Sequence, residues 1–174
     1  MDLRGLVRAL TSLVRTGWML RGVPASMGET VAEHSFVAAL VAADLSQYVG
    51  ADPYRAAMIA LVHDATEAVV GDIPKTANIG QAKGEAERAA LSKLDLPKPL
   101  REALLEYMEG RSLESKVARL ADLVATAIVA DEYEGLGFDV GEIKETSARE
   151  IEQLAGELAS GPLKARLREL GVLR

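Results

Sequence analysis

The sequence predicts an all-α fold of about six to eight helices. Ala, Leu and Val supply most of the apolar residues, whereas aromatic residues make up only 4% of the 174 positions. Such a mixture favours packed helices over sheets. Apolar residues recur at helical spacing in several segments, and no segment shows the period-two alternation of a half-buried strand. Because 49% of the residues are hydrophobic, we expect one core and a single domain over residues 1–174.

The N-terminal part of the chain predicts two helices joined by a loop. An apolar stripe indicates the first helix over residues 3–15, and a polar, glycine-containing loop follows over residues 16–29. The run Thr30-Val-Ala-Glu33 is a capping box, in which the threonine side chain caps the Glu33 amide while the glutamate reaches back. A second helix is therefore expected from Thr30 to about residue 49.

A third helix is expected over about residues 53–70. Asp52 can act as its N-cap with Pro53 at the first helical position, and Gly71 is a natural C-terminal stop. Periodicity indicates four further helices over residues 81–94, 99–109, 114–133 and 141–158, and a short amphipathic tail after Pro162.

Composition excludes several kinds of protein. The net charge of −6 argues against a broad surface for nucleic-acid polymers, which needs a basic stripe. The chain has no cysteine, so any metal ion must take nitrogen or oxygen ligands. No segment approaches the roughly twenty unbroken apolar residues of a membrane span. The N-terminus lacks a signal-peptide pattern, so we expect a soluble cytoplasmic protein.

The only two histidines are His34 and His63. His34 falls in the first turn of a predicted helix, where the helix dipole disfavours the imidazolium and leaves the neutral ring that binds metals. His63 and Asp64 close an apolar run, and Glu67 follows within one turn on the same predicted helix face. The alternative for this second group is a buried hydrogen bond between His63 and a carboxylate, with Glu67 solvated.

Asp122 is the only charged residue between Leu120 and Ala130, on a helix apolar enough to be buried. A buried carboxylate needs a partner, which could be a metal ion or Arg119 one turn earlier. Two histidines and two aspartates would form a ligand set suited to Mn²⁺, Co²⁺, Fe²⁺, Ni²⁺ or, less distinctively, Zn²⁺.

The order His34, His63-Asp64, Asp122 resembles the pattern of the HD-domain superfamily of metal-dependent phosphohydrolases. Within it, the chain is similar to the branch of 5′-deoxynucleotidases. The similar stretches are Arg15-Thr-Gly-Trp18, Gly22-Val-Pro, Thr30-Val-Ala-Glu-His34-Ser35, His63-Asp-Ala-Thr-Glu67-Ala-Val-Val-Gly-Asp72-Ile-Pro74, Ala121-Asp122-Leu123 and Glu132-Tyr-Glu-Gly-Leu136.

This resemblance implies an all-helical HD-domain bundle that hydrolyses nucleoside 5′-monophosphates, preferably deoxy forms, and assembles as a homodimer. It implies one divalent ion, since two-metal HD proteins need more ligands than are present. Glu67 would orient or deprotonate the attacking water, and Asp72 would lie near the sugar. Trp18 would pack at the nucleotide pocket, although a core or loop anchor is an equally good interpretation of this residue.

One departure from the family pattern concerns the phosphate. Bacterial deoxynucleotidases place an arginine directly before this tryptophan, whereas Gly17 stands here. Arg15, Arg21 and Lys75 are the candidates to reach the phosphate instead, although the sequence favours a solvated surface charge for each of them.

Two other functions remain open from the sequence. The same scaffold could serve a phosphodiesterase or an alarmone hydrolase, because the metal ligands do not distinguish these substrates. Alternatively, the protein could bind nucleotides with negligible turnover, although the presence of Glu67 argues mildly against this.

Overall fold

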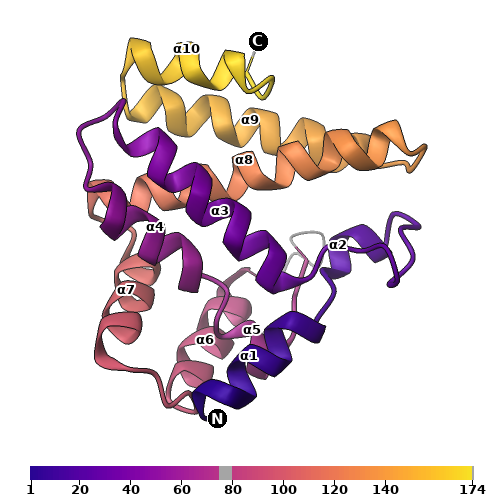
Figure 1. Cartoon of the computed structure of the whole chain (residues 1–174), viewed down its shortest axis with the longest axis vertical. Helices are drawn as coiled ribbons and strands as arrows, with labels where there is room; N and C mark the ends of the chain where they lie inside the picture. The colour runs from indigo at the N-terminus through magenta and orange to yellow at the C-terminus, as the bar shows by residue number, and fades with distance from the viewer. Residues whose placement is uncertain (75–79, 174) are drawn as a thin grey trace.

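The computed structural model describes residues 1–74 and 80–173, and this part of the chain is all-α, as predicted. Its only β-type pairing is an isolated bridge between Val14 and Thr30. Eight longer helices and two four-residue helices are present in the described part (Figure 1). They are α1 (Leu3–Ser12), α2 (Thr16–Met19), α3 (Val31–Ser46), α4 (Pro53–Val62), α5 (Glu67–Val70), α6 (Gly80–Leu91), α7 (Lys98–Glu109), α8 (Leu113–Gly135), α9 (Gly141–Glu157) and α10 (Gly161–Glu169).

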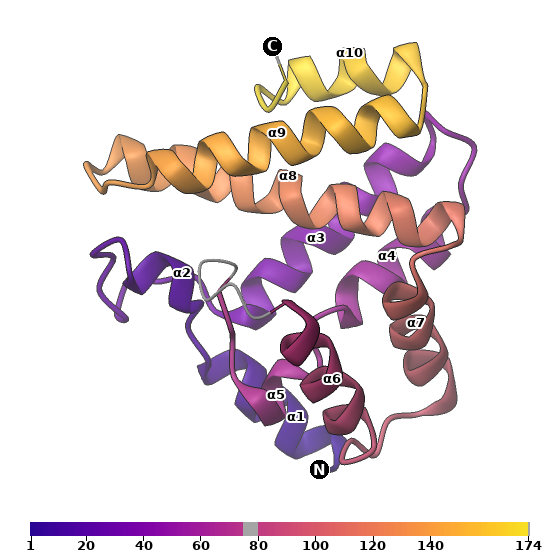
Figure 2. The ribbon, with the colours of Figure 1, turned by 180° about the vertical axis from the view of Figure 1, so that it is seen from behind.

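Helix α8 is the centre of the packing. It contacts α3, α4, α7 and α9. Helices α9 and α10 lie on one side of it, and α5, α6 and α7 on the other (Figure 2). The α8 residues that face the core are fully buried, and several are alanines that allow neighbouring helices to approach closely: Val117, Ala118, Leu120, Ala121, Val124 and Ala125. The helix that carries Asp122 is therefore fixed by packing on several sides.

The starts of α3 and α4 follow the predicted capping chemistry. Thr30 Oγ1 accepts a hydrogen bond from the Glu33 amide at 3.2 Å, and Glu33 Oε2 accepts from the Thr30 amide at 2.7 Å. At the start of α4, the Asp52 carboxylate accepts from the Tyr54 amide at 2.9 Å. Because the capping box fixes where α3 begins, it also fixes which way the His34 side chain points.

The predicted helix over residues 53–70 is interrupted. Helix α4 ends at Val62, a turn follows, and α5 begins at Glu67. The His63 ring explains the break, because its Nδ1 lies 2.6 Å from the Ala60 carbonyl oxygen and satisfies this group near the helix end. The prediction that Glu67 shares a helix face with His63 and Asp64 was therefore wrong, since Glu67 belongs to a separate turn of helix.

The predicted loop over residues 16–29 contains helix α2. Trp18 in this helix is only 2% exposed and packs against a small apolar cluster that includes Val23, Ala130 and Val140. Its ring meets the Tyr133 ring edge-on, with centroids 5.1 Å apart. Burial of one large aromatic side chain thus orders a segment whose polar composition predicted a loop.

No helix in the described part of the chain has the length and apolar content to cross a membrane.

Thr30→Ala tests the capping box. We expect the free energy of unfolding to fall by about 1 kcal/mol, because the Glu33 amide loses its side-chain acceptor. Chemical denaturation of the metal-free protein measures this loss. Thr11→Ala is the control, since Thr11 is exposed and caps no helix start, and it should change stability by less than about 0.5 kcal/mol. Equal effects of the two substitutions would contradict the capping role.

Candidate metal centre

The structure brings the four predicted ligands together from separate elements. His34 lies on α3, His63 and Asp64 follow α4, and Asp122 lies on α8. His34, His63 and Asp122 each place one ligand atom within 4.8 Å of the others. His34 Nε2 is 2.9 Å from Asp122 Oδ1, and His63 Nε2 is 3.8 Å from the same oxygen. Asp64 Oδ2 lies 3.0 Å from His63 Nε2 and 4.0 Å from His34 Nε2.

The orientation of His63 fits a metal ligand. Its Nδ1 donates to the Ala60 carbonyl, so the ring turns Nε2 toward Asp64 and Asp122. Nε2 is buried, and among the described residues it has no partner with hydrogen-bond geometry, although Asp64 Oδ2 is close. A backbone bond on one ring nitrogen and an unsatisfied second nitrogen is the usual arrangement of a ligating imidazole. The donor set therefore fits a divalent cation.

Asp122 is not paired with Arg119, the alternative that the sequence left open. The Arg119 guanidinium donates to the Tyr107 carbonyl at 2.8 Å and stacks over the Tyr107 ring, with 4.8 Å from Cζ to the centroid. Burial raises the pKa of Asp122, but a hydrogen bond from His34 and the electrostatic attraction of His63, His34 and Arg15 outweigh it and hold this pKa well below its usual range. Asp122 is thus an ionised carboxylate between two imidazoles.

The two aspartates also act on His63. Burial lowers the pKa of the His63 imidazole, but the negative charge of Asp64, whose Oδ2 lies 3.0 Å from Nε2, and the charge of Asp122 overcome this and raise the pKa to about 9. In the metal-free protein a proton on His63 therefore partly balances the two carboxylates. A cation bound in this place would have to displace that proton.

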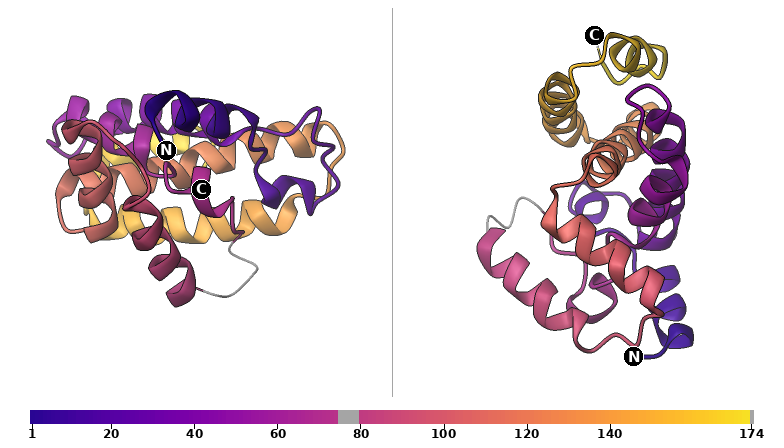
Figure 3. Two further views of the ribbon diagram at one scale, coloured as in Figure 1. Left: turned by 90° about the horizontal axis from the view of Figure 1, so that it is seen from below. Right: turned by 90° about the vertical axis from the view of Figure 1, so that its left-hand side faces the viewer.

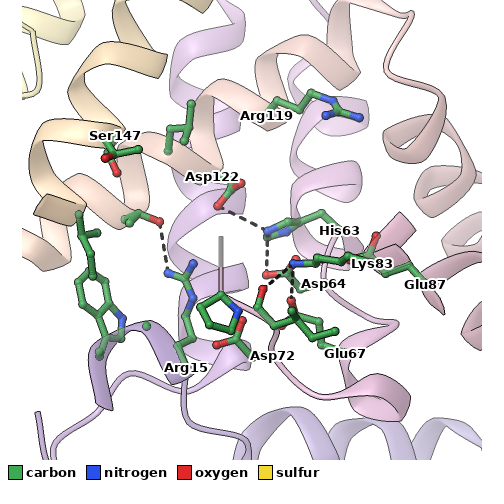
Figure 4. A pocket seen from close by; sticks show the side chains of 18 of the residues that line it. Arg15, His63, Asp64, Glu67, Asp72, Lys83, Glu87, Arg119, Asp122 and Ser147 are labelled. Atoms are coloured by element: carbon green, nitrogen blue, oxygen red, sulfur yellow. Dashed lines mark hydrogen bonds and ion pairs between the residues drawn. The ribbon is translucent and has the colours of Figure 1, made fainter. Parts of the chain in front are cut away.

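A cavity of about 560 Å³ opens beside these side chains (Figure 4). Its wall includes most of the residues that the sequence singled out: Arg15, Trp18, Arg21, His63, Asp64, Glu67, Asp72 and Asp122. His34 lies behind them and is fully buried. Lys75 lies outside the described residues. The cavity volume is in the range of small-molecule sites.

Glu67 is buried in this wall, with only 3% of its surface exposed. Its Oε2 has no hydrogen-bond partner among the described residues, and its Oε1 lies 3.6 Å from Lys83 Nζ. Burial, together with the negative charges of Asp64 and Asp72, raises the pKa of Glu67 to about 9. The carboxyl group is therefore protonated at neutral pH in the metal-free protein.

Asp72 joins two segments of the pocket wall. Its carboxylate accepts a hydrogen bond from the Thr16 amide, and the Thr16 hydroxyl donates to the Asp72 carbonyl at 2.9 Å. Asp72, two residues after the end of α5, is thereby bonded to Thr16, the first residue of α2. Asp72 thus helps to hold the α2 segment, and Trp18 with it, at the cavity.

The cations differ in how deeply they lie in the pocket. Of the two predicted cations in the wall, Arg15 is the more buried, and its NH1 donates to Glu29 and Thr126. Arg21 lies nearer the surface and pairs with Glu142, an exposed residue of α9. A phosphate inside the cavity could therefore contact Arg15 directly. Arg21 would have to break its ion pair with Glu142 before it could bind the phosphate.

Two residues of the site were missed by the sequence analysis. Lys83 donates to the Ile73 carbonyl at 3.1 Å and lies 3.6 Å from both Glu67 and Glu87. In the sequence, Lys83 and Glu87 have the i,i+4 spacing of an ordinary ion pair on a surface helix, so nothing indicated that Lys83 belongs to the site. Glu29 accepts from Trp18 Nε1 at 2.8 Å. Glu29 is buried, but the sequence predicted a polar loop over residues 16–29, where an exposed glutamate is common, so nothing singled it out.

The stability of the metal-free protein should fall as the pH rises from about 6.5 to 9. The folded pKa of His63 lies above its ordinary value of 6.5, so its stabilising contribution is complete below pH 6.5 and is lost toward pH 9. Glu67 has the same sign, because the fold favours its protonated form. We expect the melting temperature in excess chelator to drop by roughly 5–10 °C across this range.

His63→Gln should make this fall smaller, since only the Glu67 contribution remains. A melting temperature of the metal-free wild type that is constant or rises between pH 6.5 and 9 would contradict the proposed charge state of the cluster.

Comparison with known proteins identifies the family. A family model described as HD domain matches residues 7–159. The chain is 34% identical to "5′-deoxynucleotidase HDDC2" of Bos taurus, covering 88% of this chain and 80% of the relative, and 32% identical to the Homo sapiens protein of the same name, covering 88% and 81%. The crystal structure of the PH0347 protein from Pyrococcus horikoshii OT3 has a TM-score of 0.78 at 31% identity and 95% coverage of both chains. This chain belongs to the HD-domain family.

Proposed function

We propose that this protein is a metal-dependent phosphohydrolase that releases phosphate from nucleoside 5′-monophosphates, with deoxynucleotides preferred. The observation that carries this proposal is the convergence of two imidazoles and two carboxylates beside a cavity, with His63, Asp64 and Asp122 in its wall and His34 buried next to them. The substrate class comes from the relatives, which are named 5′-deoxynucleotidases.

The charge of the pocket supports a bound cation. Asp64, Glu67, Asp72, Glu87 and Asp122 line the cavity, and an anionic phosphate would be repelled by those that are ionised. The neighbouring cations only partly compensate, because Arg15 is already paired with Glu29 and Lys83 lies close to Glu67. A positive ion in this place would reverse the local field and let a phosphate approach.

His34, His63, Asp64 and Asp122 would hold one divalent ion, Mn²⁺, Co²⁺, Fe²⁺, Ni²⁺ or Zn²⁺. Such an ion supplies Lewis-acid stabilisation of the negative charge on the phosphoryl oxygens and makes a water molecule more acidic.

Glu67 is the proton acceptor in this proposal. It follows Asp64 by one short turn and faces the cavity (Figure 4). A positive charge nearby lowers the pKa of a carboxyl group, so Glu67 ionises once the cation is present, and Lys83 favours the same form. Glu67 then accepts a proton as water attacks phosphorus, and the 5′-oxygen of the nucleoside leaves with the P–O bond electrons and takes up a proton.

The remaining wall residues position the nucleotide. Arg15 is the inner cation for the phosphate, whereas Arg21 lies toward the surface. Trp18 and Asp72 would bound the space for the nucleoside. A cavity of about 560 Å³ suits a mononucleotide, and no nucleic-acid polymer or membrane partner is part of the proposal.

A homodimer would form through an apolar face of α1 and α3. Leu3, Val7, Phe36 and Leu40 are each between 49% and 59% exposed. Both pairs are four residues apart, so each forms a ridge on its helix. The two helices are in contact and lie on the same side of the molecule (Figure 3). An exposed apolar surface of this kind is typical of an interface between subunits.

We also propose that residues 1–174 form one domain. Buried residues from Leu6 in α1 to Val172 after α10 belong to one apolar cluster, which is what a single domain requires. The cytoplasmic location stays a prediction.

The function is tested by phosphate release from a panel of nucleoside monophosphates with Mn²⁺ or Co²⁺. Asp122→Asn should lower kcat/KM by at least about 100-fold, because it removes a charged ligand from the centre. Asp139→Asn is the matched control, since Asp139 is exposed in the loop before α9, and it should retain wild-type activity. Equal phosphate release by wild type and Asp122→Asn would refute the proposal.

The same panel separates the alternatives when cyclic and bis-phosphorylated nucleotides are included. Faster hydrolysis of either class would assign a phosphodiesterase or an alarmone hydrolase. Tight nucleotide binding in calorimetry without phosphate release would assign a nucleotide-binding protein.

Phe36→Lys tests the proposed dimer. A charge placed in the apolar face should shift the protein toward monomer, because the buried lysine would lack a partner. Sedimentation velocity at several concentrations measures the change. Leu136→Lys is the control, since Leu136 is 63% exposed at the end of α8, far along the chain from this face. A wild-type protein that is monomeric throughout would contradict the dimer.

A further inference from the structure

Glu29 carries an unexplained buried oxygen beside a proposed metal ligand. The residue is 8% exposed and stands directly before Thr30, the N-cap of α3. Its Oε2 accepts from Trp18 Nε1 at 2.8 Å and from Arg15 NH1 at 3.3 Å. Its Oε1 is buried and has no hydrogen-bond partner in the described part of the chain. That oxygen lies 3.6 Å from His34 Nδ1.

The two ring nitrogens of His34 have different surroundings. Nε2 lies 2.9 Å from Asp122 Oδ1, on the side of the proposed ion. Nδ1 lies 3.0 Å from Arg15 NH1 and 3.6 Å from Glu29 Oε1. An arginine can only donate hydrogen bonds. While Arg15 is the partner, Nδ1 must accept and the proton of a neutral ring must be on Nε2, where it points at Asp122.

A cation cannot bind to a ring nitrogen that carries a proton. For His34 to ligate through Nε2, the proton of the neutral imidazole has to be on Nδ1. Arg15 cannot accept that proton. Glu29 Oε1 can, because it is a carboxylate oxygen that has no hydrogen-bond partner among the described residues and needs to approach by only a fraction of an ångström to form a hydrogen bond.

We propose that Glu29 is the positioning residue of the metal centre: its Oε1 accepts the Nδ1 proton of His34 and thereby keeps Nε2 free for the ion. The proposal rests on the metal-dependent function argued above. Metal-ligating histidines generally donate their second nitrogen to a carboxylate, a carbonyl or water, and this arrangement raises their basicity. His63 uses the Ala60 carbonyl for this purpose, and Glu29 gives His34 its equivalent.

The environment of Glu29 holds the carboxylate ready for this role. The Trp18 indole fixes Oε2, and the Tyr133 hydroxyl accepts a hydrogen bond from the Glu29 amide at 2.8 Å. If Glu29 served only to anchor the Trp18 indole, its Oε2 would be sufficient. Glutamine could supply that anchor equally well, since its carbonyl oxygen can accept from the indole, but its amide would lack the negative charge that favours a proton on Nδ1.

Glu29→Gln therefore separates the two roles. Zn²⁺ is the probe, because it is diamagnetic, and its affinity is measured by competition with a chelator. We expect Glu29→Gln to bind Zn²⁺ 10–100-fold more weakly than wild type, the usual effect of losing such a partner. Glu132→Gln is the matched control. It makes the same change of charge at an exposed position of α8, so it should keep the Zn²⁺ affinity within about threefold.

Long-range ¹H–¹⁵N NMR gives a readout that does not depend on any variant. The chain has only two histidines, so the four ring nitrogens can be assigned. In Zn²⁺-loaded wild type, His34 should coordinate through Nε2 and show a slowly exchanging, strongly downfield Nδ1 proton bonded to a carboxylate. In the metal-free protein the proton should be on Nε2.

The outcomes are distinct. Wild type that binds Zn²⁺ while Glu29→Gln binds it equally well would overturn the role of Glu29 alone. An exposed, rapidly exchanging Nδ1 proton in the loaded wild type would do the same. Wild type that binds no divalent cation would overturn the proposed function, and the inference with it.

Discussion

The fold depends on the packing of α3 and α4 against α8, because these contacts bring His34, His63 and Asp122 to one point. The apolar side chains around them are fully buried, so close packing restricts movement of the three helices. The polar cluster is costly inside such a core unless its charges are matched. Without a cation, the Asp122 carboxylate is balanced by two imidazoles and Arg15. The packing of the core thus holds the carboxylates and imidazoles close together, and a bound cation would balance the negative charge of this cluster.

The charge balance also explains why the pocket holds residues that the ligand set does not need. Burial of Glu67 and repulsion by the negative charges of Asp64 and Asp72 raise the pKa of its carboxyl group, which is therefore neutral in the metal-free protein. Lys83 reaches across from α6 to a carbonyl and two glutamates, which limits this repulsion. A helix that looks like a surface element in sequence therefore contributes to the chemistry of the cavity.

The sequence predicted features whose cause is local, and missed those whose cause is tertiary. The capping box at Thr30 and the single charge of Asp122 in an apolar helix were readable because both depend on neighbours along the chain. The break after Val62 could not be predicted, because the helical periodicity of the sequence continues through it. The His63 ring, which bonds to the Ala60 carbonyl, is visible only in the structure. Glu29 was also unreadable, since it is buried by contact with Trp18 and Tyr133, more than ten and one hundred residues away respectively.

These tertiary contacts make residues 15–30 a mechanical link between the nucleotide side and the metal side of the pocket. The segment is held at one end by Asp72 through Thr16 and in its middle by the Trp18 indole on Glu29. The same Glu29 carboxylate faces His34, and Arg15 bridges it to Thr126 on α8. A nucleotide that shifts Trp18 would therefore shift the carboxylate that orients a metal ligand. Coupling between substrate and ion therefore requires no domain movement, because the buried Glu29 lies against both Trp18 on the nucleotide side and His34 on the metal side.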